Sequence, residues 1–126
     1  MNLFTKLKKM DLLLIDDDEW IRDSLTLYFE SEGCRITALE TAEEGLNIIR
    51  QKQFDIIITD YRLPGMNGLE FIKSLPPNQA KAYKILITAY GNRDIFSEAQ
   101  SIGIDECIAK PFTSDTIEAS LQQLID

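Results

Sequence analysis

The chain has 126 residues, a formal net charge of −8 and no histidine. This length suits one domain with a single core, and the acidity argues against direct binding to nucleic acid or to an anionic membrane. The absence of histidine excludes Ser-His-Asp and Cys-His catalysis and every histidine-ligated metal site. No apolar run approaches the roughly 20 residues of a membrane span, and no signal peptide is recognisable, so we expect a cytoplasmic protein.

Short apolar runs alternate with amphipathic segments along the chain. Residues 1–10 are lysine-rich and are expected to form a short solvated leader, with the domain itself at 11–126. Hydrophobic runs predict strands at 12–15, at 35–39, up to residue 60, at 84–88 and at 106–109. Periodicity and capping signals predict helices after 16–19 and at about 41–51, 67–75, 91–103 and 113–125. The alternation indicates an α/β fold, a doubly wound (βα)5 sandwich whose parallel sheet has helices on both faces.

Chemically active side chains gather at the ends of the predicted strands. Asp16 and Asp17 follow the first strand, Asp60 ends the third, Thr88 ends the fourth and Lys110 follows the fifth. In a parallel sheet these ends share one edge, where open α/β sheets build their sites. Three carboxylates about 5 Å apart repel by about 3 kcal/mol per pair, so the fold keeps them for a cation, for a shared proton, or only as capping and solvated acids. Oxygen ligands without histidine or cysteine favour Mg²⁺, with Mn²⁺ as an alternative.

The same edge suits phosphoryl transfer. A carboxylate such as Asp60 is an established type of nucleophile that forms an acyl phosphate. A metal ion and Lys110 would neutralise charge on the transferred group, while Thr88 would donate a hydrogen bond to one of its oxygens.

Four motifs in order carry a resemblance to a known family. They are Leu14-Ile15-Asp16-Asp17-Asp18, Ile57-Ile58-Thr59-Asp60 with Leu63-Pro64-Gly65-Met66-Asn67-Gly68, Ile87-Thr88-Ala89-Tyr90-Gly91, and Ala109-Lys110-Pro111-Phe112. From about residue 10 to 125 the sequence resembles the receiver domain of two-component response regulators. The resemblance implies the strand order 2-1-3-4-5 and a cis peptide before Pro111.

The resemblance also implies a function. Asp60 would accept a phosphoryl group from a sensor histidine kinase or a phosphotransfer protein, with Mg²⁺ held by Asp16, Asp17, Asp60 and the backbone carbonyl of Arg62. The domain would then be a phosphoacceptor rather than an enzyme with a separate substrate. Its output would pass to a protein target or effector domain, or to a homodimer, through the face formed by the fourth helix, the fifth strand and the fifth helix.

Three residues depart from, or modulate, the family pattern. Cys107 stands where the family usually has Phe or Tyr, which predicts that the signal leaves through the backbone after Thr88. Arg62 and Tyr90 are expected to shield the acyl phosphate from water. Both cysteines, Cys34 and Cys107, are expected to be small buried residues, and the implied strand order places them too far apart for a disulfide.

Two alternatives stay open from the sequence. A haloacid-dehalogenase-like phosphatase would use Asp16 and Asp18 as its D-x-D pair with Thr88 and Lys110, although only Asp115 and Glu118 could then supply its last acidic motif. A phosphorylation-silent pseudo-receiver would keep the fold as an interaction module.

Overall fold

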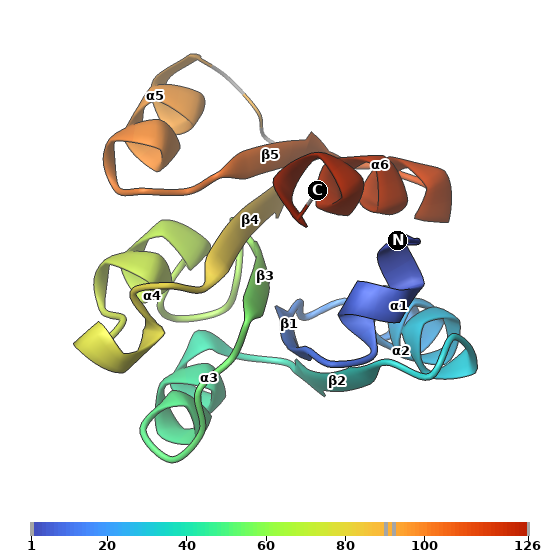
Figure 1. Ribbon diagram of the computed structural model, residues 1–126. Helices are drawn as coiled ribbons and strands as arrows, with labels where there is room; N and C mark the ends of the chain where they lie inside the picture. Colours follow the sequence, from blue (N-terminus) through green and yellow to red (C-terminus); the bar gives the residue numbers. More distant parts are fainter. Residues whose placement is uncertain (1, 90, 92, 126) are drawn as a thin grey trace.

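The computed structural model describes residues 2–89, 91 and 93–125. Its centre is a five-stranded parallel sheet with the order β2-β1-β3-β4-β5, which confirms the predicted fold class (Figure 1). The strands are β1 Asp11–Ile15, β2 Arg35–Leu39, β3 Ile56–Asp60, β4 Tyr83–Thr88 and β5 Glu106–Ala109. The helices are α1 Leu3–Leu7, α2 Glu19–Ser31, α3 Ala42–Ile49, α4 Gly68–Lys73, α5 Arg93–Ser101 and α6 Ser114–Ile125, and a 3-10 turn spans Pro77–Gln79.

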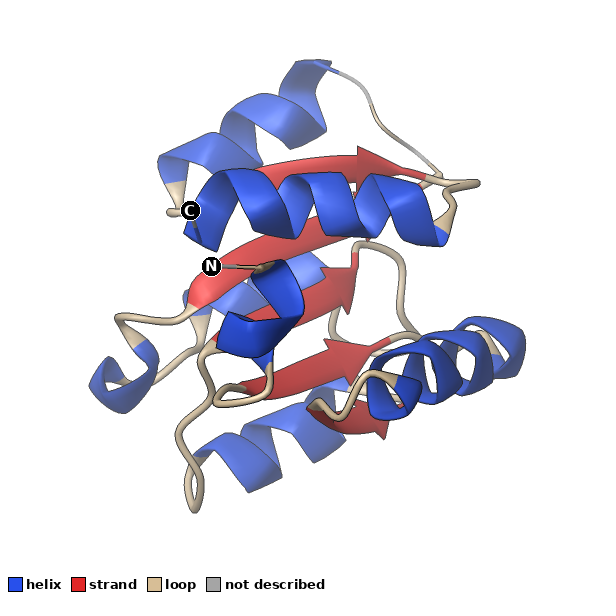
Figure 2. Ribbon diagram, turned by 45° about the vertical axis from the view of Figure 1, so that its right-hand side comes forward, coloured by secondary structure: helices blue, strands red, loops and turns tan. Residues whose placement is uncertain are grey.

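Helices cover both faces of the sheet (Figure 2). Successive residues of a strand point to opposite faces, so each central strand serves two cores. Leu14 and Ile58 pack in a cluster with residues of α1, α2 and α6, whereas Leu13 and Ile57 pack in another with residues of α3, α4 and α5. Burial on both sides explains why the strand sequences are continuous apolar runs.

Residues 2–10 do not form the solvated leader that we expected. Leu3 and Leu7 of α1 are 8% and 0% exposed and belong to the same core cluster as α2 and α6. The ring of Phe4 meets the ring of Tyr28 edge-on at a centroid distance of 6.1 Å. The i, i+4 spacing of the two leucines gives this short helix an apolar side, and burial of that side outweighs the charge of Lys6 within the helix. The boundary at residue 11 stays a prediction.

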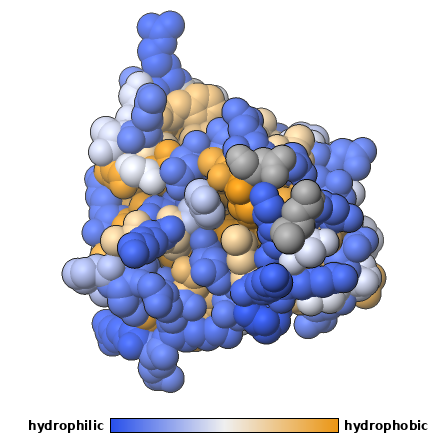
Figure 3. All heavy atoms as spheres, viewed as in Figure 1, coloured by the Kyte–Doolittle hydropathy of each residue, from blue (hydrophilic) through white to orange (hydrophobic). Residues whose placement is uncertain are grey.

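Local signals fix where the helices next to the site begin. The Asp18 side chain accepts hydrogen bonds from the backbone N–H groups of Trp20 and Ile21 at the start of α2. Thr41 and Glu44 form the predicted capping box of α3. Within the described residues, no helix is long and apolar enough to cross a membrane. On the face seen in Figure 3, hydrophilic residues predominate and hydrophobic ones show in separate patches.

Candidate functional site

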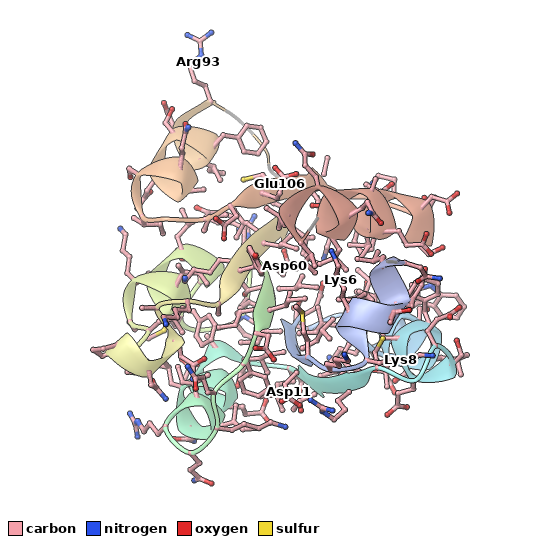
Figure 4. All side chains as sticks on the ribbon, in the orientation of Figure 1. Lys6, Lys8, Asp11, Asp60, Arg93 and Glu106 are labelled. Carbon is pink, nitrogen blue, oxygen red and sulfur yellow. The ribbon has the colours of Figure 1, made fainter. Side chains whose placement is uncertain are left out.

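The predicted acidic cluster forms at the carboxyl edge of the sheet. Asp60 ends β3 and is 5% exposed, Asp16 follows β1 and is fully buried, and Asp17 beside it is exposed (Figure 4 labels Asp60). One carboxylate oxygen from each of the three lies within 4.8 Å of the other two. The arrangement follows from the parallel register, because β1 and β3 are hydrogen-bonded neighbours and end at the same level.

Lys110 joins this cluster from the end of β5. Its Nζ lies 2.8 Å from Asp60 Oδ2 and 3.0 Å from Asp16 Oδ2. Burial works against the charge of this amine, but the contacts with Asp60 and Asp16 outweigh it and raise the pKa of Lys110, so the side chain is a cation at neutral pH. The backbone N–H of Lys110 donates to the Thr88 carbonyl oxygen at 2.9 Å, and the following peptide bond to Pro111 is cis, as the resemblance implies.

The environment of Asp16 suits a cation better than an isolated carboxylate. Its Oδ1 accepts the backbone N–H of Asp18 at 2.9 Å. Its buried Oδ2 has no hydrogen-bond partner among the described residues, since the contact with Lys110 is an ion pair without hydrogen-bond geometry. Burial is the main reason that the pKa of Asp16 is raised, and the nearby charge of Asp60 adds to it.

The donor set fits a hard divalent ion. The buried Asp16 Oδ2, whose one close partner among the described residues is the Lys110 amine, converges with the buried carboxylate of Asp60 and the exposed one of Asp17 within one ion's reach. Oxygen-only ligation of this kind suits Mg²⁺, Mn²⁺ or Ca²⁺. Asp16, Asp17 and Asp60 would hold such an ion, while the contribution of the Arg62 carbonyl stays a prediction.

The loop after Asp60 depends on contacts that were not predicted from the sequence. A Cβ atom on Gly68 would lie 2.2 Å from the carbonyl oxygen of Asp60, so no larger residue fits there without moving the end of β3. The Thr59 hydroxyl donates to the same Asp60 carbonyl at 3.0 Å. The N–H of Gly68 donates to the Tyr61 carbonyl at 2.8 Å. Gly68 belongs to the second sequence motif and could have been singled out there. The hydrogen bond from Thr59 could not have been predicted, because no sequence pattern indicates it.

Comparison with known proteins decides between the interpretations. A family model described as the response regulator receiver domain matches residues 12–122. This chain is a response regulator receiver domain. Its function is therefore phosphorylation-dependent signalling in two-component systems, and the phosphatase and pseudo-receiver alternatives gain no support from the comparisons.

The relatives of this receiver domain differ in length. It is 29% identical over 117 residues to the transcriptional regulatory protein FixJ of Bradyrhizobium diazoefficiens, covering 93% of this chain and 57% of FixJ. It is 29% identical over 114 residues to the sporulation initiation phosphotransferase F of Bacillus subtilis, covering 90% of this chain and 92% of that protein. The chain thus spans little more than half of some curated relatives and nearly all of others.

Solved structures agree with the fold. The chemotaxis response regulator CheY4 of Vibrio cholerae superposes with a TM-score of 0.85 at 24% identity, covering 92% of this chain and 98% of CheY4. A Burkholderia pseudomallei response regulator, solved with a phosphorylated aspartic acid, a calcium ion and citrate, superposes with a TM-score of 0.83 at 28% identity. That match covers 90% of the receiver domain and 66% of the Burkholderia chain.

The structure describes two of the three predicted accessory residues, Thr88 and Arg62. Thr88 is 1% exposed at the end of β4, and Arg62 is exposed, with its backbone N–H donating to Asp60 Oδ1 at 3.3 Å. Their roles stay predictions. Tyr90 lies outside the described residues, so its shielding role is a prediction as well.

The cysteines do not behave alike. Cys34 is buried as expected, but Cys107 is exposed, so its expected burial is wrong. The reason is the position of β5 at the edge of the sheet, where Ile108 points inward and Cys107 lies on the opposite face, beside an open pocket lined by Phe96 and Gln100 of α5. Partial burial and the charge of Glu106 raise the pKa of the Cys107 thiol, which disfavours a reactive thiolate. Both cysteines are free, in agreement with the prediction of no disulfide.

A groove opens beside the site. It has a volume of about 500 Å³ and lies between the start of α2 and the loop from β5 to α6, with Trp20, Tyr28, Lys110 and Phe112 among its lining residues. Trp20 is 78% exposed on this groove, and it is the only tryptophan of the receiver domain. Its indole therefore offers an optical probe next to the acidic cluster.

Proposed function

We propose that Asp60 is the phosphoacceptor of this receiver domain. The observation that supports it is the ion pair at 2.8 Å between Asp60 Oδ2 and Lys110 Nζ, which places a nearly buried nucleophile next to a fixed cation and two further carboxylates. A carboxylate oxygen of Asp60 would attack the phosphorus of a phosphohistidine. The P–O bond forms as the P–N bond breaks, and the electron pair returns to the imidazole of the donor.

Each neighbouring side chain has a role in this proposal. Lys110 would neutralise charge on the phosphoryl oxygens, from a position that it already holds in the unphosphorylated protein. Thr88, at the end of the adjacent strand, would donate its hydroxyl to a phosphoryl oxygen. Asp16 and Asp17 would hold Mg²⁺, which when bound supplies charge neutralisation for the incoming group. Mn²⁺ would serve as well, and the calcium ion of the Burkholderia structure supports a divalent site of this type.

The partners follow from this chemistry. These 126 residues contain no histidine, so the phosphohistidine would lie outside this domain, in a sensor histidine kinase or a phosphotransfer protein. We place the reaction in the cytoplasm, and we expect no turnover of a separate substrate. The output would pass through the face of α5, β5 and α6, either to a protein target or effector domain or to a second copy.

Acetyl phosphate provides a direct test that needs no kinase. Incubation with acetyl phosphate and Mg²⁺ should add the mass of one phosphoryl group to the wild-type protein, and the addition should disappear in Asp60→Ala and with EDTA. An unchanged mass in the wild type would refute the proposal. Hydrolysis of p-nitrophenyl phosphate that depends on Asp16 and not on Asp60 would instead favour the phosphatase mechanism.

A further inference from the structure

The loop at 61–67 connects the proposed acceptor to α4, and its two ends are fixed by backbone bonds. The Tyr61 N–H donates to the Ile87 carbonyl oxygen at 2.8 Å, and the Gly68 N–H donates to the Tyr61 carbonyl oxygen at 2.8 Å. Leu63 anchors the loop from within, since it is only 7% exposed. Gly65 is exposed and Met66 is half-buried, so these two residues form the outer side of this loop.

A side chain from a different helix meets the loop at this outer side. Glu43 Oε2 accepts the backbone N–H of Met66 at 3.3 Å. The same oxygen lies 2.9 Å from the position that a Cβ atom would take on Gly65, whose φ is +76°. The carboxylate therefore rests directly against the Gly65 backbone, in space that any side chain at residue 65 would occupy.

The start of α3 holds Glu43 in place. The Thr41 hydroxyl accepts the N–H of Glu44, and the Glu44 carboxylate accepts the N–H of Thr41, so the capping box fixes the first turn without using Glu43. Glu43 lies inside this turn and is free to bond the loop. Because Glu43 is exposed and Thr41 and Glu44 cap the helix, we expect its replacement to leave the fold intact.

We propose that Glu43 is a positioning residue for the phosphoacceptor loop. By accepting the Met66 N–H it restricts the loop that follows Asp60 and that carries the carbonyl of Arg62. It thereby sets the affinity of the acidic cluster for Mg²⁺ and the rate at which Asp60 is phosphorylated. This hydrogen bond couples the position of the loop to helix α3. The effect on the phosphorylation rate rests on the proposed role of Asp60. The restriction of the loop by Glu43 does not, because it can be measured in the metal-free, unphosphorylated protein.

Three variants separate positioning from charge. Glu43→Ala removes the acceptor and the charge, Glu43→Gln keeps an oxygen acceptor but loses the charge, and Glu40→Gln removes an exposed charge from the residue preceding the capping box. Amide hydrogen exchange of Met66 is measured in EDTA, Mg²⁺ binding by calorimetry, and phosphorylation by intact mass at several acetyl phosphate concentrations. Loss of one hydrogen bond should speed Met66 exchange and weaken Mg²⁺ binding by about threefold to tenfold in Glu43→Ala.

The expected pattern has an internal control. Glu43→Gln should match Glu40→Gln in Mg²⁺ affinity and should keep the slow exchange of Met66, because an amide oxygen accepts the same bond. The proposal is overturned if Met66 exchanges at the wild-type rate in Glu43→Ala, or if Glu43→Ala binds Mg²⁺ as tightly as Glu40→Gln. If the wild-type protein takes up no phosphoryl group while Met66 exchange and Mg²⁺ affinity still depend on Glu43, the role of Asp60 fails and the positioning role stands.

Discussion

Replacing Lys110 by methionine should expose the electrostatic cost of the acidic cluster. Nζ is about 3 Å from a carboxylate oxygen of both Asp16 and Asp60, and the lysine side chain is 17% exposed. Each contact corresponds to about 5 kcal/mol of Coulomb attraction at an effective dielectric near 20, before desolvation is subtracted. Removing one member of a buried pair generally costs about 3–5 kcal/mol, because the partner charge stays behind. The site opens to solvent at Asp17, so we expect the lower end, about 3 kcal/mol, for the metal-free protein.

Urea unfolding in EDTA and in excess Mg²⁺ measures this cost. Lys110→Met should lower the free energy of unfolding strongly in EDTA and less in Mg²⁺, since a bound cation replaces the missing charge. Lys81→Met, which removes an equally charged but exposed side chain, is the matched control. The reasoning is refuted if Lys110→Met is no less stable than Lys81→Met in EDTA, or if Mg²⁺ widens the difference between them.

Further substitutions test the cluster, the acceptor loop and the opposite edge of the sheet. Burial raises the pKa of Asp16 above its unfolded value, so the ionised carboxylate lowers the free energy of unfolding as pH rises above 3.8. In EDTA at pH 7, Asp16→Asn should therefore unfold at a higher urea concentration than the wild type. The same variant should lose its stabilisation by Mg²⁺. Gly68→Ala should lower the free energy of unfolding in urea by about 1–3 kcal/mol, because the new Cβ would lie 2.2 Å from the carbonyl oxygen of Asp60. Helix propensity alone would favour alanine by about 1 kcal/mol, so a gain in stability would contradict the clash. The hydrogen bond from Arg35 lowers the pKa of Asp11, so the stability that this contact adds is present above pH 3.8 and is lost as pH falls through the lower folded pKa. The difference in the free energy of unfolding between wild type and Asp11→Asn should therefore vanish at low pH. A difference that stays constant with pH would argue against this contact.

Sequence alone predicts best those elements whose ends are marked by local residues, such as turn residues or helix caps. The strands at 35–39 and 106–109 have the predicted bounds, because apolar runs flanked by turn residues leave little freedom. Helix α4 ends at Lys73, short of the predicted Leu75. Its start is fixed by a second capping box, between Asn67 and Glu70, which the N-x-x-E spacing could have indicated.

Errors arose where tertiary burial decides. Leu3 and Leu7 fit a solvated amphipathic turn as well as a buried one, and only the space between α2 and α6 makes them core residues. Cys107 was expected inside because cysteine is usually buried, but that expectation ignores the edge position of β5. The three carboxylates could be placed at one edge from topology, whereas the double contact of Lys110 depends on side-chain reach that no spacing encodes.

Charge balance joins the stability of this site to its function. Asp16, Asp17 and Asp60 carry −3 and Lys110 carries +1, so the cluster has a formal charge of −2, which one divalent cation balances. Lysine alone therefore leaves the metal-free edge of the sheet repulsive; burial is the main cause of the raised pKa of Asp16, and the charge of Asp60 adds to it. The lysine that limits this repulsion contacts the carboxylate proposed to receive the phosphoryl group. A substitution that relieves the cluster should then also weaken the reaction, because the same charges raise the energy of the resting state and attract the metal and the phosphoryl group.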